Sequence, residues 1–194
     1  MKGSKNAKLI PFSKIEHYDM TIIEPVPLSQ LDKEKFQTRL KLAQELMVPD
    51  TLFIQIMAHA PGYGEALFDA MYQSHAIGNV DHALKEIIRV QLARIAKDNY
   101  FGTLRSKKAI DLGLTEARIE AGCGDFETDP QFSEAAKWAL KYSKLMYTEP
   151  KKVNTDFYNI GKRFYSEPEI MELGAFIAFH YGMQMFMRTL KIIL

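Results

Sequence analysis

The chain has 194 residues, of which 47% are apolar and 25% are charged, values that are typical of a globular domain with a full hydrophobic core. Its formal net charge is +1, so the chain has no excess of basic residues that would attract nucleic acids or anionic membranes. A single cysteine, Cys123, excludes both a disulfide within the chain and a Cys-x-x-Cys redox centre.

The hydropathy of the chain argues against membrane insertion. The first residues, MKGSKNAKLIPFSK, contain lysines but no apolar run as long as that of a signal peptide. The most apolar segment, residues 170–187, contains Glu172, His180 and Gln184, which makes it a poor membrane span. We therefore expect a cytoplasmic protein without a nucleic-acid or membrane partner.

The N-terminal region differs from the rest of the chain. Two prolines in IIEPVPLSQL, and the absence of a helical period, predict an extended arm over residues 1–30. Residues 31–194 are expected to form one helical domain. Its first helix has apolar residues at steps of three to five and ends before Pro49. A short helix, a break at Pro61-Gly62 and a helix that ends near Gly78 are expected next.

The segment NVDHALKEIIRVQLARIAKDN carries the most regular helical pattern. Its apolar residues form one stripe, and Asp81 precedes them at the position of an N-cap. A basic helix over roughly 100–112 is expected to follow, with Gly113 at the left-handed position that ends it. The next short helix is expected to begin after Thr115 and to end at Gly122.

Three more helical segments complete the chain: DPQFSEAAKWALKYSKLMYTEP, TDFYNIGKRFY and SEPEIMELGAFIAFHYGMQMFMRTL. Ser166 and Pro168 suit the cap and the first turn of the last helix. That helix is apolar nearly all round, which predicts a central place in the core and a contact with a partner subunit. No segment of real length alternates with period two, so the predicted fold class is all-α.

The segment HALKEIIRVQLARIAKDNYFGTLRSKKAIDLGLTEARI resembles the carboxymuconolactone decarboxylase and alkylhydroperoxidase D-like family. In that family a Glu near the start of one helix is followed by a Cys-x-x-Cys-x-x-x-His element on the next helix, and then by a Gly. Glu86 matches the family Glu, Arg105 stands at the His position and Gly113 matches the Gly. The likeness extends over residues 45–192.

The two cysteine positions of the family hold other residues in this chain. Asp98 stands at the first position and Phe101 at the second, with Tyr100 between them. Neither can act in disulfide-based peroxidase chemistry, which needs a thiolate and a resolving thiol. Oxidation of Cys123 alone would stop at a sulfenic acid, which would need a thiol from another molecule to form a disulfide.

The resemblance implies an all-helical fold that forms a homotrimer or homohexamer, with its site in a cleft near a subunit interface. The decarboxylase branch of the family works without cysteines. We therefore expect acid–base chemistry on a small organic acid or lactone, without a cofactor. One alternative is a non-catalytic small-molecule-binding or assembly protein, and another is a peroxidase that uses Cys123.

Two charged residues are the main candidates for this chemistry. Glu86 is the expected general acid or base, with a pKa raised by a dry pocket. Its alternative role is a solvated ion pair with Arg89 at i+3. Arg105 is expected to bind a substrate carboxylate, since a guanidinium stays protonated and cannot act as a base. Its alternatives are a solvated surface charge or a pair with Glu86 or Asp98.

The remaining candidates have supporting roles. Asp98 assists catalysis or forms a local turn, and Tyr100 donates a proton or hydrogen bond to the substrate or only packs its ring. Phe101 lies one turn before Arg105 and shares its face in the substrate site. His180 is either a reserve base or a hydrogen-bonded histidine of the core. The five histidines follow no metal-binding pattern, so no metal is expected.

Overall fold

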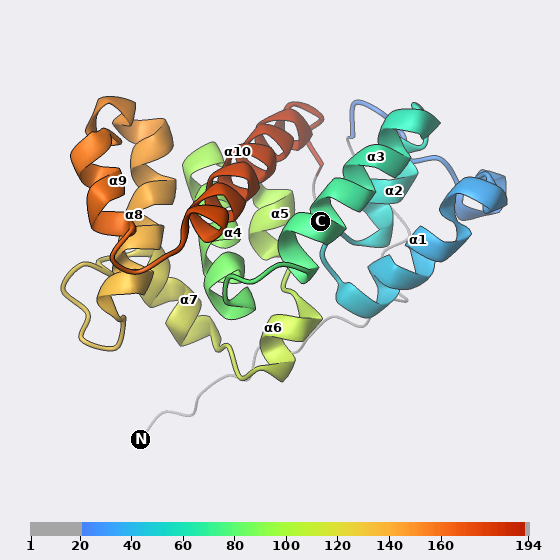
Figure 1. The fold of residues 1–194 in the computed structure, drawn as a ribbon. Coiled ribbons are helices and arrows are strands. Elements are labelled where there is room, and N and C mark those ends of the chain that lie inside the picture. Colours follow the sequence, from blue (N-terminus) through green and yellow to red (C-terminus); the bar gives the residue numbers. More distant parts are fainter. Residues whose placement is uncertain (1–20, 193–194) are drawn as a thin grey trace, which may run out of the picture.

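The computed structural model describes residues 21–192, and within this range the chain forms helices and no strand (Figure 1). The predicted all-α fold class is therefore confirmed. The α-helices and shorter helical turns are η2 Leu28–Gln30, α1 Lys33–Leu46, α2 Thr51–Met57, α3 Pro61–Met71, η3 Tyr72–Ala76, α4 His82–Ala96, α5 Asn99–Thr103, α6 Lys107–Asp111, α7 Glu116–Cys123, α8 Glu134–Thr148, η4 Pro150–Lys152, α9 Thr155–Gly161 and α10 Glu167–Thr189.

Helix ends lie where the capping residues indicate. The side chains of Asp81 and Thr115 accept hydrogen bonds from backbone N–H groups in the first turns of α4 and α7. Gly113 has φ +88°, a left-handed conformation that favours glycine. Ser166 and Glu169 form a capping box at the start of α10. Short polar side chains next to the helix starts were therefore sufficient to predict these boundaries.

The basic helix expected over roughly 100–112 is in fact two short helices, α5 and α6. Leu104 and Ser106 between them have extended backbone conformations. The guanidinium of Arg89 binds the carbonyls of Phe101 and Leu104. These carbonyls are thereby satisfied from another helix, so the chain can leave the helical path without unpaired polar groups.

The helix expected to end near Gly78 also differs. α3 ends at Met71, and the π-helix η3 follows it. Gly78 then turns the chain with φ +102°. A π-helical turn widens the helix and changes the direction of its side chains, and η3 directs His75 into the interior.

α4 and α10 occupy the centre of the molecule, with α1–α3 on one side and α8–α9 on the other (Figure 1). Two clusters of buried apolar side chains fill the two sides. Leu92 of α4 and Phe176 of α10 belong to the cluster with α8 and α9. Ala93 and Met187 of the same helices belong to the cluster with α1–α3. The predicted central place of the last helix in the core is therefore confirmed.

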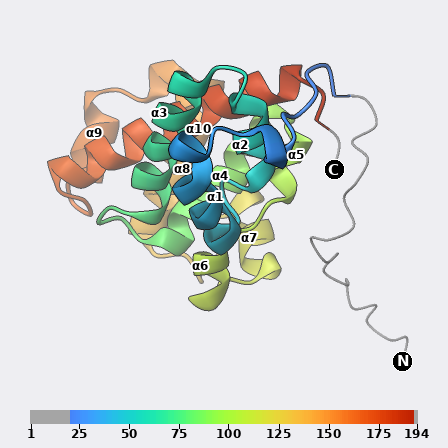
Figure 2. The ribbon, with the colours of Figure 1, turned by 90° about the vertical axis from the view of Figure 1, so that its right-hand side faces the viewer.

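The described part of the predicted arm runs along the surface of the domain, near α2 and the end of α10 (Figure 2). The backbone N–H of Ile22 donates to Leu190 O at 3.0 Å, and that of Val26 donates to Gln55 O at 3.0 Å. The arm's residues 1–20 lie outside the described range. No helix within residues 21–192 is long and apolar enough to cross a membrane.

Candidate functional site

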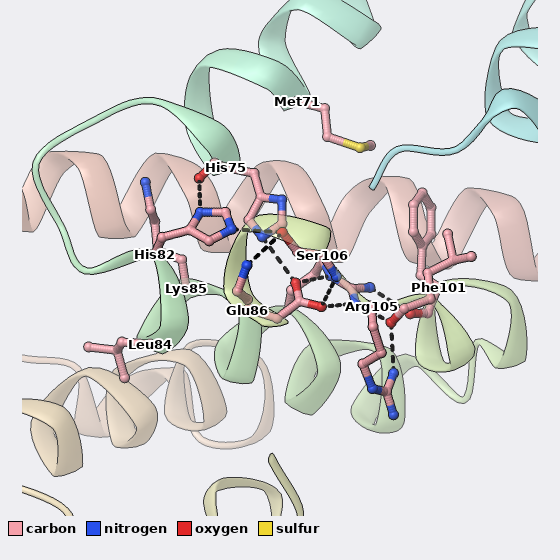
Figure 3. Close-up of polar contacts among 12 residues, drawn as sticks. Met71, His75, His82, Leu84, Lys85, Glu86, Phe101, Arg105 and Ser106 are labelled. Carbon is pink, nitrogen blue, oxygen red and sulfur yellow. Dashed lines mark hydrogen bonds and ion pairs between the residues drawn. The ribbon is translucent and has the colours of Figure 1, made fainter. Parts of the chain in front are cut away.

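Glu86 lies in the second turn of α4 and is completely buried. Arg89, one turn further on, donates from Nε to Oε2 and from Nη2 to Oε1, both at 2.8 Å. The backbone N–H of Ser106 donates to Oε1 at 2.9 Å. His75 Nε2 lies 3.0 Å from Oε2 (Figure 3). The carboxylate is therefore enclosed by polar groups from three segments of the chain.

The expected raised pKa of Glu86 is wrong. Burial alone raises the pKa of this carboxyl, but the charge and hydrogen bonds of Arg89, together with His75, outweigh burial and hold the pKa well below its usual range. The partner is the Arg89 that the alternative interpretation named, but the pair lies in the core and not in solvent. Glu86 is therefore ionised at neutral pH.

Arg89 connects this pair to α5. It is fully buried, and its Nη1 and Nη2 donate to Phe101 O at 2.5 Å and to Leu104 O at 2.6 Å. Its own carbonyl accepts from Gln184 Nε2 of α10 at 3.0 Å. Arg89 therefore sets the position of α5 relative to α4 and α10.

His75 and His82, which no sequence pattern placed together, have ring centroids 4.5 Å apart. His82 Nδ1 lies 2.8 Å from His75 O, so this nitrogen carries the proton. His82 Nε2 then accepts from Ser106 Oγ at 2.8 Å. Burial lowers the pKa of His82 to about 4, which keeps the ring neutral at pH 7.

Lys85 is a further buried residue that sequence reasoning missed. Its Nζ donates to Ser74 O at 3.0 Å, to Ile77 O at 2.7 Å and to Glu172 Oε1 at 2.9 Å. These contacts hold the segment after η3 against α10. The available signal was a group of charged or polar residues on a helix with an apolar stripe, and α4 buries five of them: His82, Lys85, Glu86, Arg89 and Gln91. A helix that is buried on all sides must pair such side chains within the protein.

Arg105 does not reach Glu86 or Asp98, so the alternative that paired it with one of these carboxylates is wrong. Its Nε and Nη2 donate to the two carboxylate oxygens of Glu116 at 2.7 and 3.0 Å. Its Nη1 donates to Gly102 O and Leu104 O, each at 2.7 Å. The break between α5 and α6 turns this side chain outward to α7. Its predicted role in substrate binding stays a prediction.

Asp98 is the N-cap of α5. Its two carboxylate oxygens accept from the backbone N–H groups of Tyr100 at 3.2 Å and Phe101 at 3.3 Å. Burial raises its pKa to about 6, although these N–H groups and the charge of Arg89 lower it. Asp98 also borders a surface hollow, whose other lining residues are Ala93, Arg94, Lys97, Asn99, Gly102 and Thr103.

The aromatic candidates lie in the core. The hydroxyl of Tyr100 donates to the buried carboxyl of Asp50, whose pKa is raised by burial. Phe101 is buried and its ring centroid lies 6.2 Å from that of Phe53. His180 is buried on α10, with its ring centroid 4.2 Å from that of Phe176. None of the three lines the hollow at Asp98.

Thiol and metal chemistry depend on Cys123 and on the arrangement of possible metal ligands in the described part of the chain. Burial raises the pKa of the Cys123 thiol to about 11, so the thiol is protonated at neutral pH. Residues 21–192 contain no group of three His, Cys, Asp or Glu side chains arranged to hold a metal ion.

No protein-family model and no curated protein matches the chain, whereas solved structures match nearly all of it. A cysteine-to-alanine variant of the debrominase Bmp8 in complex with 2,3,4-tribromopyrrole has a TM-score of 0.75 at 20% identity, over 91% of this chain and 93% of that one. The alkylhydroperoxidase AhpD core of an uncharacterized peroxidase-related protein from Ralstonia eutropha JMP134 has a TM-score of 0.71 at 14% identity, over 88% and 90%. A peroxidase-related protein from Silicibacter sp. TM1040 has a TM-score of 0.69 at 12% identity, over 90% and 89%.

The chain has the AhpD-like fold. The predicted resemblance is thereby confirmed for the alkylhydroperoxidase D-like architecture. Its other part, likeness to carboxymuconolactone decarboxylases in particular, stays a prediction.

Proposed function

We propose that this AhpD-like chain is an enzyme that carries out acid–base chemistry on a small organic acid or lactone at the hollow bordered by Asp98. One arrangement carries the proposal: the Asp98 carboxyl, whose pKa burial raises to about 6, borders the same hollow as the cationic side chains of Lys97 and Arg94, and Arg94 also pairs with Glu120. A carboxyl that is part protonated near neutral pH suits proton transfer, and the two cations suit a carboxylate substrate.

In this proposal, each residue at the hollow has a separate role. Arg94 and Lys97 attract the substrate carboxylate, and Asp98 gives or accepts the proton. In a decarboxylation, the bond between the substrate carbon and its carboxylate breaks, carbon dioxide leaves, and the electron pair of that bond moves towards an adjacent carbonyl to form an enolate. The protonated form of Asp98 then supplies the proton to the enolate carbon.

Glu86 has a positioning role in this proposal. Its carboxylate is enclosed by Arg89, Ser106 and His75, and Arg89 binds two carbonyls at the end of α5. The ion pair thus holds the helix whose N-cap is Asp98. The same enclosure favours a second candidate function, a binding protein without turnover, because the family's Glu is then occupied in stabilising the fold.

The proposal is tested by the kinetics of Asp98→Asn on substrates found in a screen of small keto acids and lactones. We expect the variant to lose about 100-fold or more in kcat, since that is the scale of general acid–base catalysis. The kcat/KM of the wild type should change with an inflection near pH 6, which the variant lacks. Asp111→Asn, at an exposed ion pair with Lys107, is the matched control.

Three results would separate the alternatives. Unchanged turnover in Asp98→Asn contradicts the assigned role of Asp98. Ligand binding by calorimetry without any turnover favours the non-catalytic function. Peroxide consumption that Cys123→Ser abolishes favours the peroxidase.

The raised pKa of Asp98 has a consequence for stability that needs no substrate. A carboxyl whose pKa is about 6 in the folded chain and about 4 in the unfolded chain destabilises the fold as pH rises between these values. Asn keeps one of the two capping hydrogen bonds through its single amide oxygen, and it carries no charge. We therefore expect Asp98→Asn to raise the free energy of unfolding by about 1–2 kcal/mol at pH 8 and by less at pH 5. Urea unfolding at both values of pH measures this, and an equal change at both contradicts the raised pKa.

A further inference from the structure

His180 and Gln184 lie one turn apart on the face of α10 that packs against α4, and both are fully buried. Among the described residues, neither ring nitrogen of His180 has a hydrogen-bond partner, and the side-chain oxygen of Gln184 also has none. Buried polar atoms in folded proteins are almost always paired with protein, water or ligand. Three such atoms on one face of one helix therefore call for a common explanation.

The chemistry of the three atoms is set by their neighbours. Gln184 Nε2 donates to Arg89 O, so Oε1 is on the other side of the amide and acts as an acceptor. Burial, together with the nearby charges of Arg89 and Lys85, lowers the pKa of His180 well below its usual range. A neutral imidazole has one N–H donor and one acceptor nitrogen. The group therefore offers one donor and two acceptors.

The charges around these atoms balance one another. Arg89 pairs with Glu86, and Lys85 pairs with Glu172. The buried cluster therefore has no unmatched charge to attract an ion. A molecule that fits there is neutral.

The surroundings limit the size of such a molecule. The ring centroid of Phe176 lies 4.2 Å from that of His180, that of Phe179 lies 5.6 Å away, and that of His75 on η3 lies 5.7 Å away. Three rings this close to one imidazole exclude a large ligand. A water molecule needs two to four polar partners, which this group supplies.

We propose that His180, with Gln184 beside it, forms an internal binding site between α10, α4 and η3 for a water-sized neutral molecule that both donates and accepts hydrogen bonds. Water and a small alcohol share this chemistry. The site is separate from the hollow at Asp98, and it does not depend on the proposed enzymatic function. It is a third interpretation of His180, beside those of a reserve base and of a histidine paired within the core.

The direct test is a crystal structure of the full chain at a resolution that shows ordered water, grown without alcohols or polyols and then soaked in one small alcohol. Density for water within hydrogen-bond distance of a ring nitrogen of His180 supports the proposal, and replacement by the alcohol would define the size that the site accepts. A metal ion, an anion or the absence of density overturns it.

The stability of His180→Phe provides a second test. A phenyl ring is close to the imidazole in shape but makes no hydrogen bonds. If a bound molecule satisfies His180, we expect the melting temperature to fall by several degrees, with Met183→Leu on the same helix as the volume-conserving control. If the nitrogens are truly unpaired, the variant is as stable as the wild type or more stable, and the proposal fails. Where the phenyl ring lowers stability by misfit, the crystal structure decides.

Discussion

At the scale of single residues, Glu86 and Arg89 illustrate how an i,i+3 pair changes character with its surroundings. On a solvated helix such a pair contributes a few tenths of a kcal/mol. Here both side chains are fully buried, and the guanidinium also binds the carbonyls of Phe101 and Leu104. Each charge is therefore needed to offset the desolvation of the other.

Removal of the negative charge should accordingly destabilise the fold. For Glu86→Gln we expect the free energy of unfolding to fall by about 3–5 kcal/mol, because Arg89 is left in the core without a counter-charge. Urea unfolding at pH 7 and one protein concentration measures the change. Glu134→Gln, in an exposed pair with Lys137, is the control and should change by less than about 0.5 kcal/mol. If Glu86→Gln instead raises stability, Glu86 is held there for function and not for the fold.

His82 should make the fold sensitive to acid. Its pKa is lowered to about 4 by burial, whereas an unfolded histidine has a pKa of about 6.5. The unfolded chain therefore takes up the proton first, and stability falls as pH decreases from about 6.5 towards 4. Relative to wild type, His82→Asn should remove roughly 1–2 kcal/mol of the loss between pH 7 and pH 5. His59→Asn, at the surface, is the control, and parallel pH curves for wild type and His82→Asn would rule out this role.

At the scale of elements, two glycines differ in how closely their helices are packed. One lies in a tight contact between two helices, and the other faces open space. A Cβ atom on Gly161, at the end of α9, would lie 2.2 Å from Trp138 Cζ2 of α8. A Cβ atom on Gly62, in the first turn of α3, would meet no atom within 4 Å. The first glycine is therefore required by packing, and the second is not.

Alanine at these two positions should have opposite effects. Gly161→Ala is expected to lower the free energy of unfolding by about 1–3 kcal/mol, since the Trp138 ring must move. Gly62→Ala should raise it by up to about 1 kcal/mol, because alanine restricts the unfolded chain. Thermal unfolding of both variants in one buffer measures the difference, and a neutral Gly161→Ala would mean that α8 and α9 separate at little cost.

At the scale of the whole molecule, α4 and α10 contribute to both hydrophobic clusters, so the two sides should unfold together. The only tryptophan, Trp138, is in the cluster with α8 and α9, whereas Phe53 is buried on the other side. We expect Phe53→Ala to lower stability by about 3–5 kcal/mol and to shift tryptophan fluorescence and far-UV circular dichroism to the same lower midpoint. A fluorescence midpoint that stays at the wild-type value would mean that the sides unfold independently.

The assembly of this chain into a homotrimer or homohexamer stays a prediction. α10 keeps three large apolar side chains exposed in the single chain, those of Met171, Met185 and Phe186. We predict that a partner subunit, if the oligomer forms, contacts this helix through these side chains.

The sequence by itself determined the all-α class, the order of the helices and many of their ends. These properties follow from local rules: the period of apolar residues, capping side chains such as Asp81 and Thr115, and the left-handed Gly113. The family pattern in the sequence also identified Glu86 and Asp98 as candidates. It did not predict that their pKa values shift in opposite directions.

Only the tertiary structure decided how the polar residues pair. Arg105 binds Glu116 instead of Glu86, because the α5–α6 break turns it outward. His75 meets Glu86 because a π-helix directs it inward. Helical periodicity describes one element at a time, whereas burial and ion pairing depend on which elements meet in space. The charge state of a carboxyl is set by those through-space neighbours, so no local pattern in the chain can specify it.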